Sequence, residues 1–65
     1  MKELLRENEV SDRLSIPVKT LQRWRYVGGG PEFVKLGHAV RYPTESLIAW
    51  VEARRCASTA EFDRG

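Results

Sequence analysis

A proline at position 17, between two segments with helical spacing of apolar residues, most constrains the fold of this chain. The proline ring fixes its own backbone and disfavours helical geometry at the preceding residue, so Ile16 is expected to be extended. Proline is well tolerated in the first turn of a helix, where its missing N–H would have had no partner. The sequence therefore predicts two short helices joined by a tight turn at Ser15–Pro17.

The first of these helices is expected to run from about Glu7 to Leu14. Val10 and Leu14 are four residues apart and form one apolar stripe, while the residues between them are polar. Acidic residues in the first turn suit the positive end of the helix dipole. A helix of only about two turns must be held by packing. Leu4 and Leu5 could pack as an apolar lead-in to it.

The second helix is expected to run from Pro17 or Val18 to Tyr26 or Val27, where the segment Gly28–Pro31 stops it. A glycine-rich phosphate loop should follow a strand, whereas these glycines follow a helix and lead into a proline. We therefore interpret them as a flexible connector.

This second helix has two different faces. Leu21 and Trp24 are three residues apart and are expected to face inward. Two short helices with such a turn make a helix-turn-helix, and a helix with a polar outer face can enter a DNA major groove. The outward residues are Lys19, Gln22 and Arg23.

Two β-rich runs follow, Glu32–Leu36 and Ala39–Tyr42, separated by the pair Gly37-His38. Their alternating side chains predict a two-stranded hairpin, although Gly-His is a weaker turn pair than Asn-Gly. A two-stranded hairpin is marginally stable in water, so it is expected to lean on the helices.

A third helix is expected after the hairpin, with Thr44 as its N-cap and Glu45 in its first turn. It should end near Arg54-Arg55, whose charges suit the negative end of the helix dipole. Its apolar stripe consists of Leu47, Ile48, Val51 and Trp50.

The chain is long enough for one domain, which we place at residues 1–55. Residues 56–65 are small or polar, with Phe62 as a lone large apolar residue, and are expected to form a flexible tail. One cysteine and one histidine, Cys56 and His38, leave no disulfide and no usual zinc-ligand pair. We therefore expect no metal or cofactor and a reducing, cytoplasmic compartment.

Membrane insertion and catalysis are also not expected. The N-terminal segment MKELLRENEV is not apolar enough for a signal peptide, and no apolar run could span a bilayer. The chain lacks a Cys/His or Ser/His/Asp set that local context would support. We predict neither an enzyme nor a small-molecule substrate.

Charge is distributed unevenly along the chain. Residues 1–12 hold two basic and four acidic residues, residues 13–41 hold six basic and one acidic, and residues 42–65 hold three basic and four acidic. A basic middle segment is typical of a protein that binds a polyanion, and acidic flanks would keep the rest of the surface away from phosphates. A solvated charged surface without a partner, or an adaptor that binds an acidic protein, is the alternative.

The string TLQRWR, followed by GGGPEFVKLGHAVRYPTESLIAW, resembles the MerR-like winged-helix family, and within it the phage excisionases and AlpA-type regulators. The resemblance covers roughly Leu4 to Arg55. Two positions depart from the family pattern: Arg6 stands where Ser or Thr often caps the first helix, and Pro17 stands where a serine often opens the second. The matching features are Thr20-Leu21 with Trp24, Gly30-Pro31, Val34-Lys35 with Gly37, Arg41-Tyr42-Pro43, and Leu47 with Trp50.

The resemblance implies a mainly α fold with a small β-hairpin, a winged helix-turn-helix of order α-α-β-β-α. It also implies that the second helix enters the major groove and that the hairpin reaches the adjacent minor groove or its phosphates. The expected function is that of an excisionase, a sequence-specific DNA-bending protein that directs an integrase toward prophage excision in a bacterial or phage-infected cell. An AlpA-type regulator at a promoter is the alternative.

The length of the chain bears on its expected partners. The sequence has no length for the dimerisation helix and effector domain of a typical MerR-type regulator. Double-stranded DNA, an integrase and neighbouring copies of the chain are the expected partners.

Arg23 is the first candidate for a base contact, because a guanidinium pairs bidentately with guanine. An ion pair with Glu9 or Asp12 is the alternative for this residue. Gln22 suits adenine. The predicted DNA-binding residues of the second helix are Lys19, Thr20, Gln22, Arg23 and Arg25, and those of the hairpin are Lys35, His38 and Arg41. Thr20 is expected to contact a phosphate or to cap the helix locally. Arg25 is a candidate for a phosphate contact, with a solvated position as its alternative, and the alternative for His38 is an exposed turn residue. The large aromatic residues Trp24, Phe33, Tyr42 and Trp50 are expected in the core.

Overall fold

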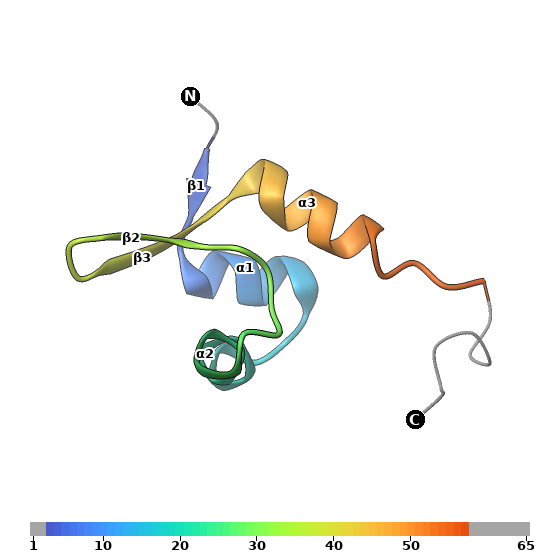
Figure 1. Cartoon of the computed structure of the whole chain (residues 1–65), viewed down its shortest axis with the longest axis horizontal. Helices are drawn as coiled ribbons and strands as arrows, with labels where there is room; N and C mark the ends of the chain where they lie inside the picture. The colour runs from blue at the N-terminus through green and yellow to red at the C-terminus, as the bar shows by residue number, and fades with distance from the viewer. Residues whose placement is uncertain (1–2, 58–65) are drawn as a thin grey trace.

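The computed structural model describes residues 3–57, and within them three helices lie at one end of a small antiparallel sheet (Figure 1). This is the predicted winged helix-turn-helix, with one strand more than the predicted order. The predicted tail, including Phe62, lies outside the described residues from position 58 onward. The elements are β1 (Leu4–Leu5), α1 (Glu7–Leu14), α2 (Val18–Val27), β2 (Val34–Leu36), β3 (Ala39–Pro43) and α3 (Thr44–Glu52).

The additional strand, β1, pairs with β3, so the sheet order is β1-β3-β2. Leu5 lies opposite Tyr42, and on the other side of β3 the hairpin pairs Leu36 with Ala39. The sequence interpretation treated Leu4-Leu5 only as an apolar lead-in. The two residues instead extend the sheet and fix the start of α1 beside the base of the hairpin.

The tight turn between α1 and α2 forms at the predicted place. Ser15 adopts a left-handed conformation with φ 56°, and the backbone N–H of Ile16 donates to the carbonyl of Ser11 over 3.1 Å. The Ser11 hydroxyl in turn donates to the carbonyl of Ile16 over 2.6 Å. Pro17 then precedes the first residue of α2. These contacts fix the angle at which the second helix leaves the first.

The hydrophobic core lies where the sheet meets the helices. It confirms the inward orientation of Leu21, which is buried, and of Trp24, which packs against the core from the same face of α2. Phe33 packs beside Tyr42, with 6.1 Å between ring centroids. The buried core residues are Leu5, Val10, Leu21, Tyr42 and Leu47.

The predictions for α3 need three corrections. Thr44 is not the N-cap, because that position falls to Pro43, and the hydroxyl and backbone N–H of Thr44 both donate to the carbonyl of Glu3 over 2.9 Å. The helix ends at Glu52 rather than near Arg54-Arg55. Arg54 reaches back, however, and donates to the carbonyl of Trp50 over 3.1 Å.

The apolar stripe of α3 is the third correction, because it is only partly buried. Leu47 reaches the core, but Ile48 and Val51 are 56% and 38% exposed. A domain with so few elements covers only one side of its last helix. Trp50 is half-buried and contacts Trp24, with 5.4 Å between ring centroids.

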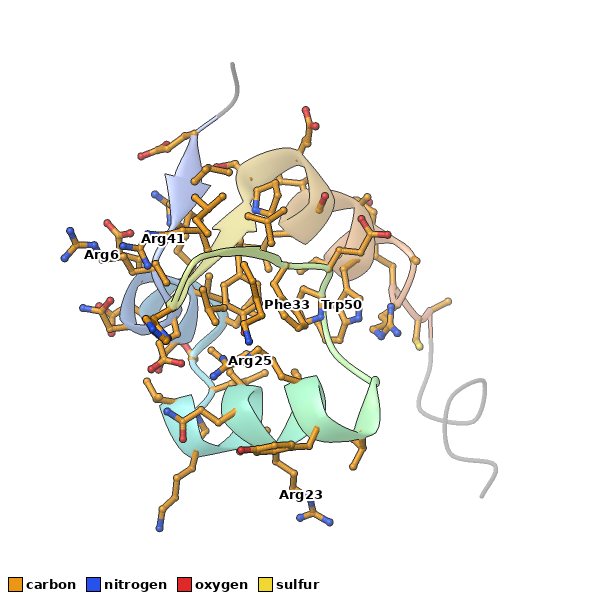
Figure 2. All side chains as sticks on the ribbon, turned by 60° about the vertical axis from the view of Figure 1, so that its left-hand side comes forward. Arg6, Arg23, Arg25, Phe33, Arg41 and Trp50 are labelled. Carbon is orange, nitrogen blue, oxygen red and sulfur yellow. The ribbon has the colours of Figure 1, made fainter. Side chains whose placement is uncertain are left out.

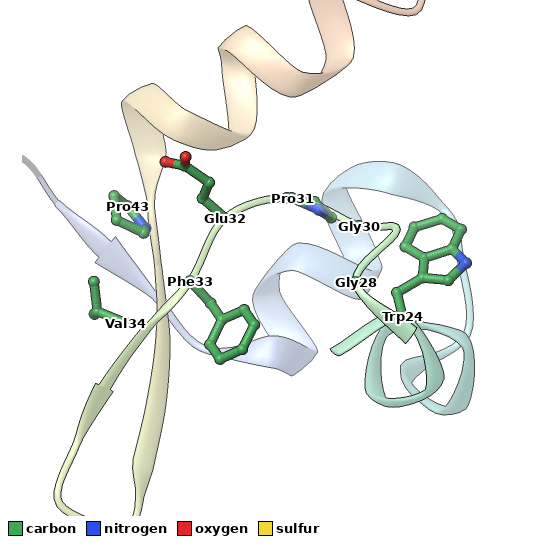
Figure 3. A pocket seen from close by; sticks show the side chains of 8 residues that line it. All are labelled: Trp24, Gly28, Gly30, Pro31, Glu32, Phe33, Val34 and Pro43. Carbon is green, nitrogen blue, oxygen red and sulfur yellow. The ribbon is translucent and has the colours of Figure 1, made fainter. Parts of the chain in front are cut away.

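The glycines after α2 have defined positions. Gly28 ends the helix with φ 80°, and its N–H donates to the carbonyl of Trp24 over 2.6 Å. A Cβ added to Gly30 would lie 2.8 Å from Trp24 Cβ and Cε3, so only glycine fits this close approach (Figure 3). The segment predicted as a flexible connector therefore packs tightly against α2 at this residue.

Candidate nucleic-acid interface

An exposed row of three side chains runs along α2, away from the core. Lys19, Arg23 and Tyr26 are four and three residues apart, which places them on one helix face. All three are exposed, and Tyr26 is 91% exposed. Figure 2 shows the Arg23 side chain projecting away from the rest of the molecule. We call these residues the outward row of α2.

Arg23 does not form the ion pair that was its alternative role. Within residues 3–57, the ion pairs join Arg25 to Glu7 and Arg55 to Glu52. No ion pair therefore joins Arg23 to Glu9 or Asp12 of α1. Its guanidinium is available to a ligand approaching the outward row.

Arg25 points the opposite way, into the angle between α1, α2 and the sheet (Figure 2). Its guanidinium donates to Glu7 Oε1 over 3.0 Å and to the Tyr42 hydroxyl over 3.1 Å, and it lies 5.9 Å from the centroid of the Phe33 ring. The hydrogen bond with Tyr42, helped by Glu7, raises the pKa of Arg25 against the opposing effect of burial. Arg25 thus links the two helices to β3, and its contact with a phosphate stays a prediction.

Gln22 shares the same carboxylate. Its Nε2 donates to Glu7 Oε2 over 3.2 Å, so the two oxygens of Glu7 accept from two residues of α2. Thr20 is half-buried in the first turn of α2, where its backbone N–H donates to the carbonyl of Pro17 over 3.0 Å. DNA contacts by Gln22 and Thr20 likewise stay predictions.

The hairpin, Val34–Pro43, projects from the body of the molecule and forms the wing (Figure 1). Gly37 turns the chain at its tip with φ 68°, a conformation that favours glycine. Lys35 and His38 are exposed near this turn, while Arg41 is half-buried and donates to the carbonyl of Val40 over 2.8 Å. The wing therefore presents the three predicted basic side chains, and their DNA contacts are untested predictions.

Two concavities occupy the angle between the wing and the helices. Both are lined by Arg25, His38 and Val40. One, of about 290 Å³, extends toward Tyr26 and Lys35, and the other, of about 520 Å³, extends toward α1. The residues that line only the second one are Arg6, Glu7, Asn8 and Arg41.

Arg6 and Asn8 were absent from the sequence-based set of binding residues. They lie in an acidic segment of the chain, and only the pairing of β1 with β3 brings them beside the wing. A sequence-based prediction of a strand at Leu4-Leu5 would have been needed to find Arg6 and Asn8.

Other kinds of site have little support in the described part of the chain. Among residues 3–57, no group of three or more His, Cys, Asp or Glu side chains could hold a metal ion. In the same residues, no helix is long and apolar enough to cross a membrane.

A family model matches most of the chain. The model of a family described as a helix-turn-helix domain matches residues 4–55, which includes all three helices and the wing. No curated protein matches the chain.

Proposed function

The chain belongs to the helix-turn-helix domain family, a DNA-binding family that includes small excisionase-like and AlpA-like proteins, and we propose that it is a sequence-specific, DNA-bending protein of the excisionase type. In this role it binds near a recombination junction and directs an integrase toward excision. Neighbouring copies of the chain bind side by side on the same DNA.

The observation that carries the proposal is the outward row of α2. Lys19, Arg23 and Tyr26 are exposed, and Arg23 forms no ion pair within residues 3–57. A helix with a diameter of about 10 Å fits the major groove, where arginine reads guanine through two hydrogen bonds. In the proposed complex Arg23 reads a base, and Lys19 contacts the adjacent edge of the groove.

The wing supplies the second contact. Lys35, His38 and Arg41 belong to the wing, which projects from the body of the molecule (Figure 1). In the proposed complex they contact the minor groove next to the major groove that α2 enters. The negative potential of a narrow minor groove attracts such cations. Contacts on two successive grooves favour a duplex that curves toward the protein, which supports DNA bending as part of the proposed function.

The test is a footprint and bend measurement on the attachment-site DNA of the genetic element that encodes the chain, together with an excision assay. Several adjacent protected sites, a bend and stimulated excision are the expected results. A single protected site at a promoter, with no effect on excision, would contradict the excisionase role and favour the AlpA-type regulator.

The salt dependence of DNA binding distinguishes the excisionase and the regulator, which both bind DNA, from an adaptor that binds an acidic protein. Binding to DNA through about six cations should weaken by orders of magnitude between about 50 mM and about 200 mM salt, with a tighter specific site above the non-specific background. Absence of any DNA affinity at low salt would contradict the DNA-binding proposal as a whole.

A further inference from the structure

We propose that Arg6 and Asn8, together with Arg41 of the wing, form a binding site for one phosphodiester of the bound duplex, between the start of α1 and the wing. The proposal rests on the DNA-binding function proposed above and adds a third element, the β1–α1 junction, to the contact surface. Neither the charge pattern nor the resemblance of the sequence pointed to this junction.

The sheet brings the two arginines together although they are far apart in the chain. Leu5 pairs with Tyr42, so the residues that follow Leu5 and precede Tyr42 are neighbours at the same end of this pairing. These residues are Arg6 and Arg41, and Figure 2 shows both on the same side of the molecule. Both line the concavity of about 520 Å³ described above, as does the exposed Asn8.

The charges in this concavity favour an anion. Arg6 and Arg41 take part in no ion pair within residues 3–57. The acid that lines the same concavity, Glu7, is already paired with Arg25 over 3.0 Å and also accepts from Gln22. Among the described residues, two guanidinium groups at one hollow in the surface therefore have no acidic partner, and one N–H of Arg41 donates only to the carbonyl of Val40.

A second acidic residue near the concavity, Glu9, also has a hydrogen-bond partner. The Glu9 carboxylate accepts the backbone N–H of Arg6 over 2.7 Å, which fixes it at the start of α1. A guanidinium offers paired N–H donors that match the oxygens of a phosphodiester, and an amide such as that of Asn8 adds a further donor. Since His38 lines the hollow as well, the site continues into the surface of the wing.

The site differs in chemistry from the outward row of α2. Phosphate contacts fix the position of a protein on DNA without reading its sequence. Arg6 is therefore expected to affect specific and non-specific sites alike, whereas Arg23 is expected to affect the specific site. The junction would hold α2 at a fixed depth in the groove.

The experiment compares Arg6→Gln, Arg41→Gln and the double variant with a matched control, Arg13→Gln. Arg13 is an exposed arginine of α1 that lines a different concavity, next to Leu14 and Ile48. Dissociation constants are measured over a salt series with a specific and an unrelated duplex. They are then measured with specific duplexes that carry one uncharged methylphosphonate at successive backbone positions.

Each of the two single variants is expected to weaken binding about 5-fold on both duplexes and to reduce the salt slope, and the double variant should reduce the slope by about 0.9 in all, the value for the one phosphate contact that both arginines share. At one methylphosphonate position, neither variant should weaken binding further, because the phosphate that both arginines contact is already neutral. Arg13→Gln should bind like the parent chain. Thermal unfolding of every variant checks that it is folded, and Arg6→Lys, which keeps the charge, should keep the salt slope.

Two results would overturn the site. The first is an unchanged salt slope and affinity for folded Arg6→Gln. The second is that the effects of Arg6→Gln and Arg41→Gln on affinity disappear at different methylphosphonate positions, which would mean that the two arginines contact different phosphates. Failure of the parent chain to bind any duplex would instead overturn the proposed function itself.

Discussion

Arg23 and Arg25 are two residues apart on α2, yet the structure gives them opposite surroundings. Arg23 projects outward without an ion pair in the described part of the chain, while Arg25 is held by Glu7 and Tyr42 and its side chain is only 22% exposed. The same residue type therefore serves two different purposes on one short helix. The comparison shows that a cation on the inner side of α2 can fix this helix to α1 and β3, while a cation on its outer side stays exposed.

The variant with the largest expected effect tests the apolar residues on the core-facing side of α2. Trp24→Ala removes a side chain that packs against the core and contacts Trp50. We expect the free energy of unfolding to fall by about 3–5 kcal/mol, measured by urea denaturation. A variant that remains as stable as the parent chain but loses DNA affinity would show that Trp24 contacts DNA, and the division between inner and outer sides would be wrong.

The second test is on the outer side. Arg23→Ala should reduce the preference for the specific DNA site by about 1–3 kcal/mol, because a bidentate base contact is lost. Its free energy of unfolding should change by less than about 0.5 kcal/mol, because the side chain is exposed and no ion pair is broken. Competition binding with specific and unrelated duplexes measures the first quantity. Full retention of specificity would contradict the assignment of α2 as the recognition helix.

Arg25→Ala is the matched inner-side variant, with a smaller expected effect. Loss of the contacts with Glu7 and Tyr42 should reduce the free energy of unfolding by about 1–2 kcal/mol. Its raised pKa means that this stabilisation is complete below the unfolded-state pKa and is lost only as pH rises through the still higher folded-state pKa. The difference in stability between variant and parent should therefore be equal at about pH 6 and about pH 9. An unchanged stability would show that Arg25 does not link α2 to the scaffold.

The smallest expected effect concerns Lys19, the first residue of the outward row. Lys19→Ala should weaken binding to specific and unrelated duplexes by about 0.5–1 kcal/mol each, because a flexible ammonium acts as a point charge. Salt-dependent binding measures it. A loss confined to the specific duplex would mean that Lys19 reads a base, and would extend the reading surface along the whole row.

The local pattern of the sequence is sufficient to predict most of the fold. Pro17 and the spacing of Leu21 and Trp24 predict the helix pair correctly, and Gly37-His38 marks the turn of the wing. The strand Leu4–Leu5 was not predictable in this way, because a two-residue strand has no period and exists only through its pairing with β3.

The candidate site was less predictable because its contacts are non-local. Helical spacing places Arg25 on α2, but its partners Glu7 and Tyr42 lie 18 and 17 residues away in the chain. The same applies to Arg6, whose neighbour Arg41 is brought to it only by the sheet. Spacing within one element identifies a face, while the partner of that face depends on the whole fold.

The shared carboxylate of Glu7 has a consequence for how such domains can diversify. Its two oxygens accept from Gln22 and Arg25, so a change at any of these positions leaves another without its partner. Among residues 3–57, no hydrogen bond or ion pair between side chains ties the outward row of α2 to another element in this way. Homologous domains that bind different operators should therefore exchange the residues at positions 19, 23 and 26 independently, whereas positions 7, 22 and 25 should covary as a unit.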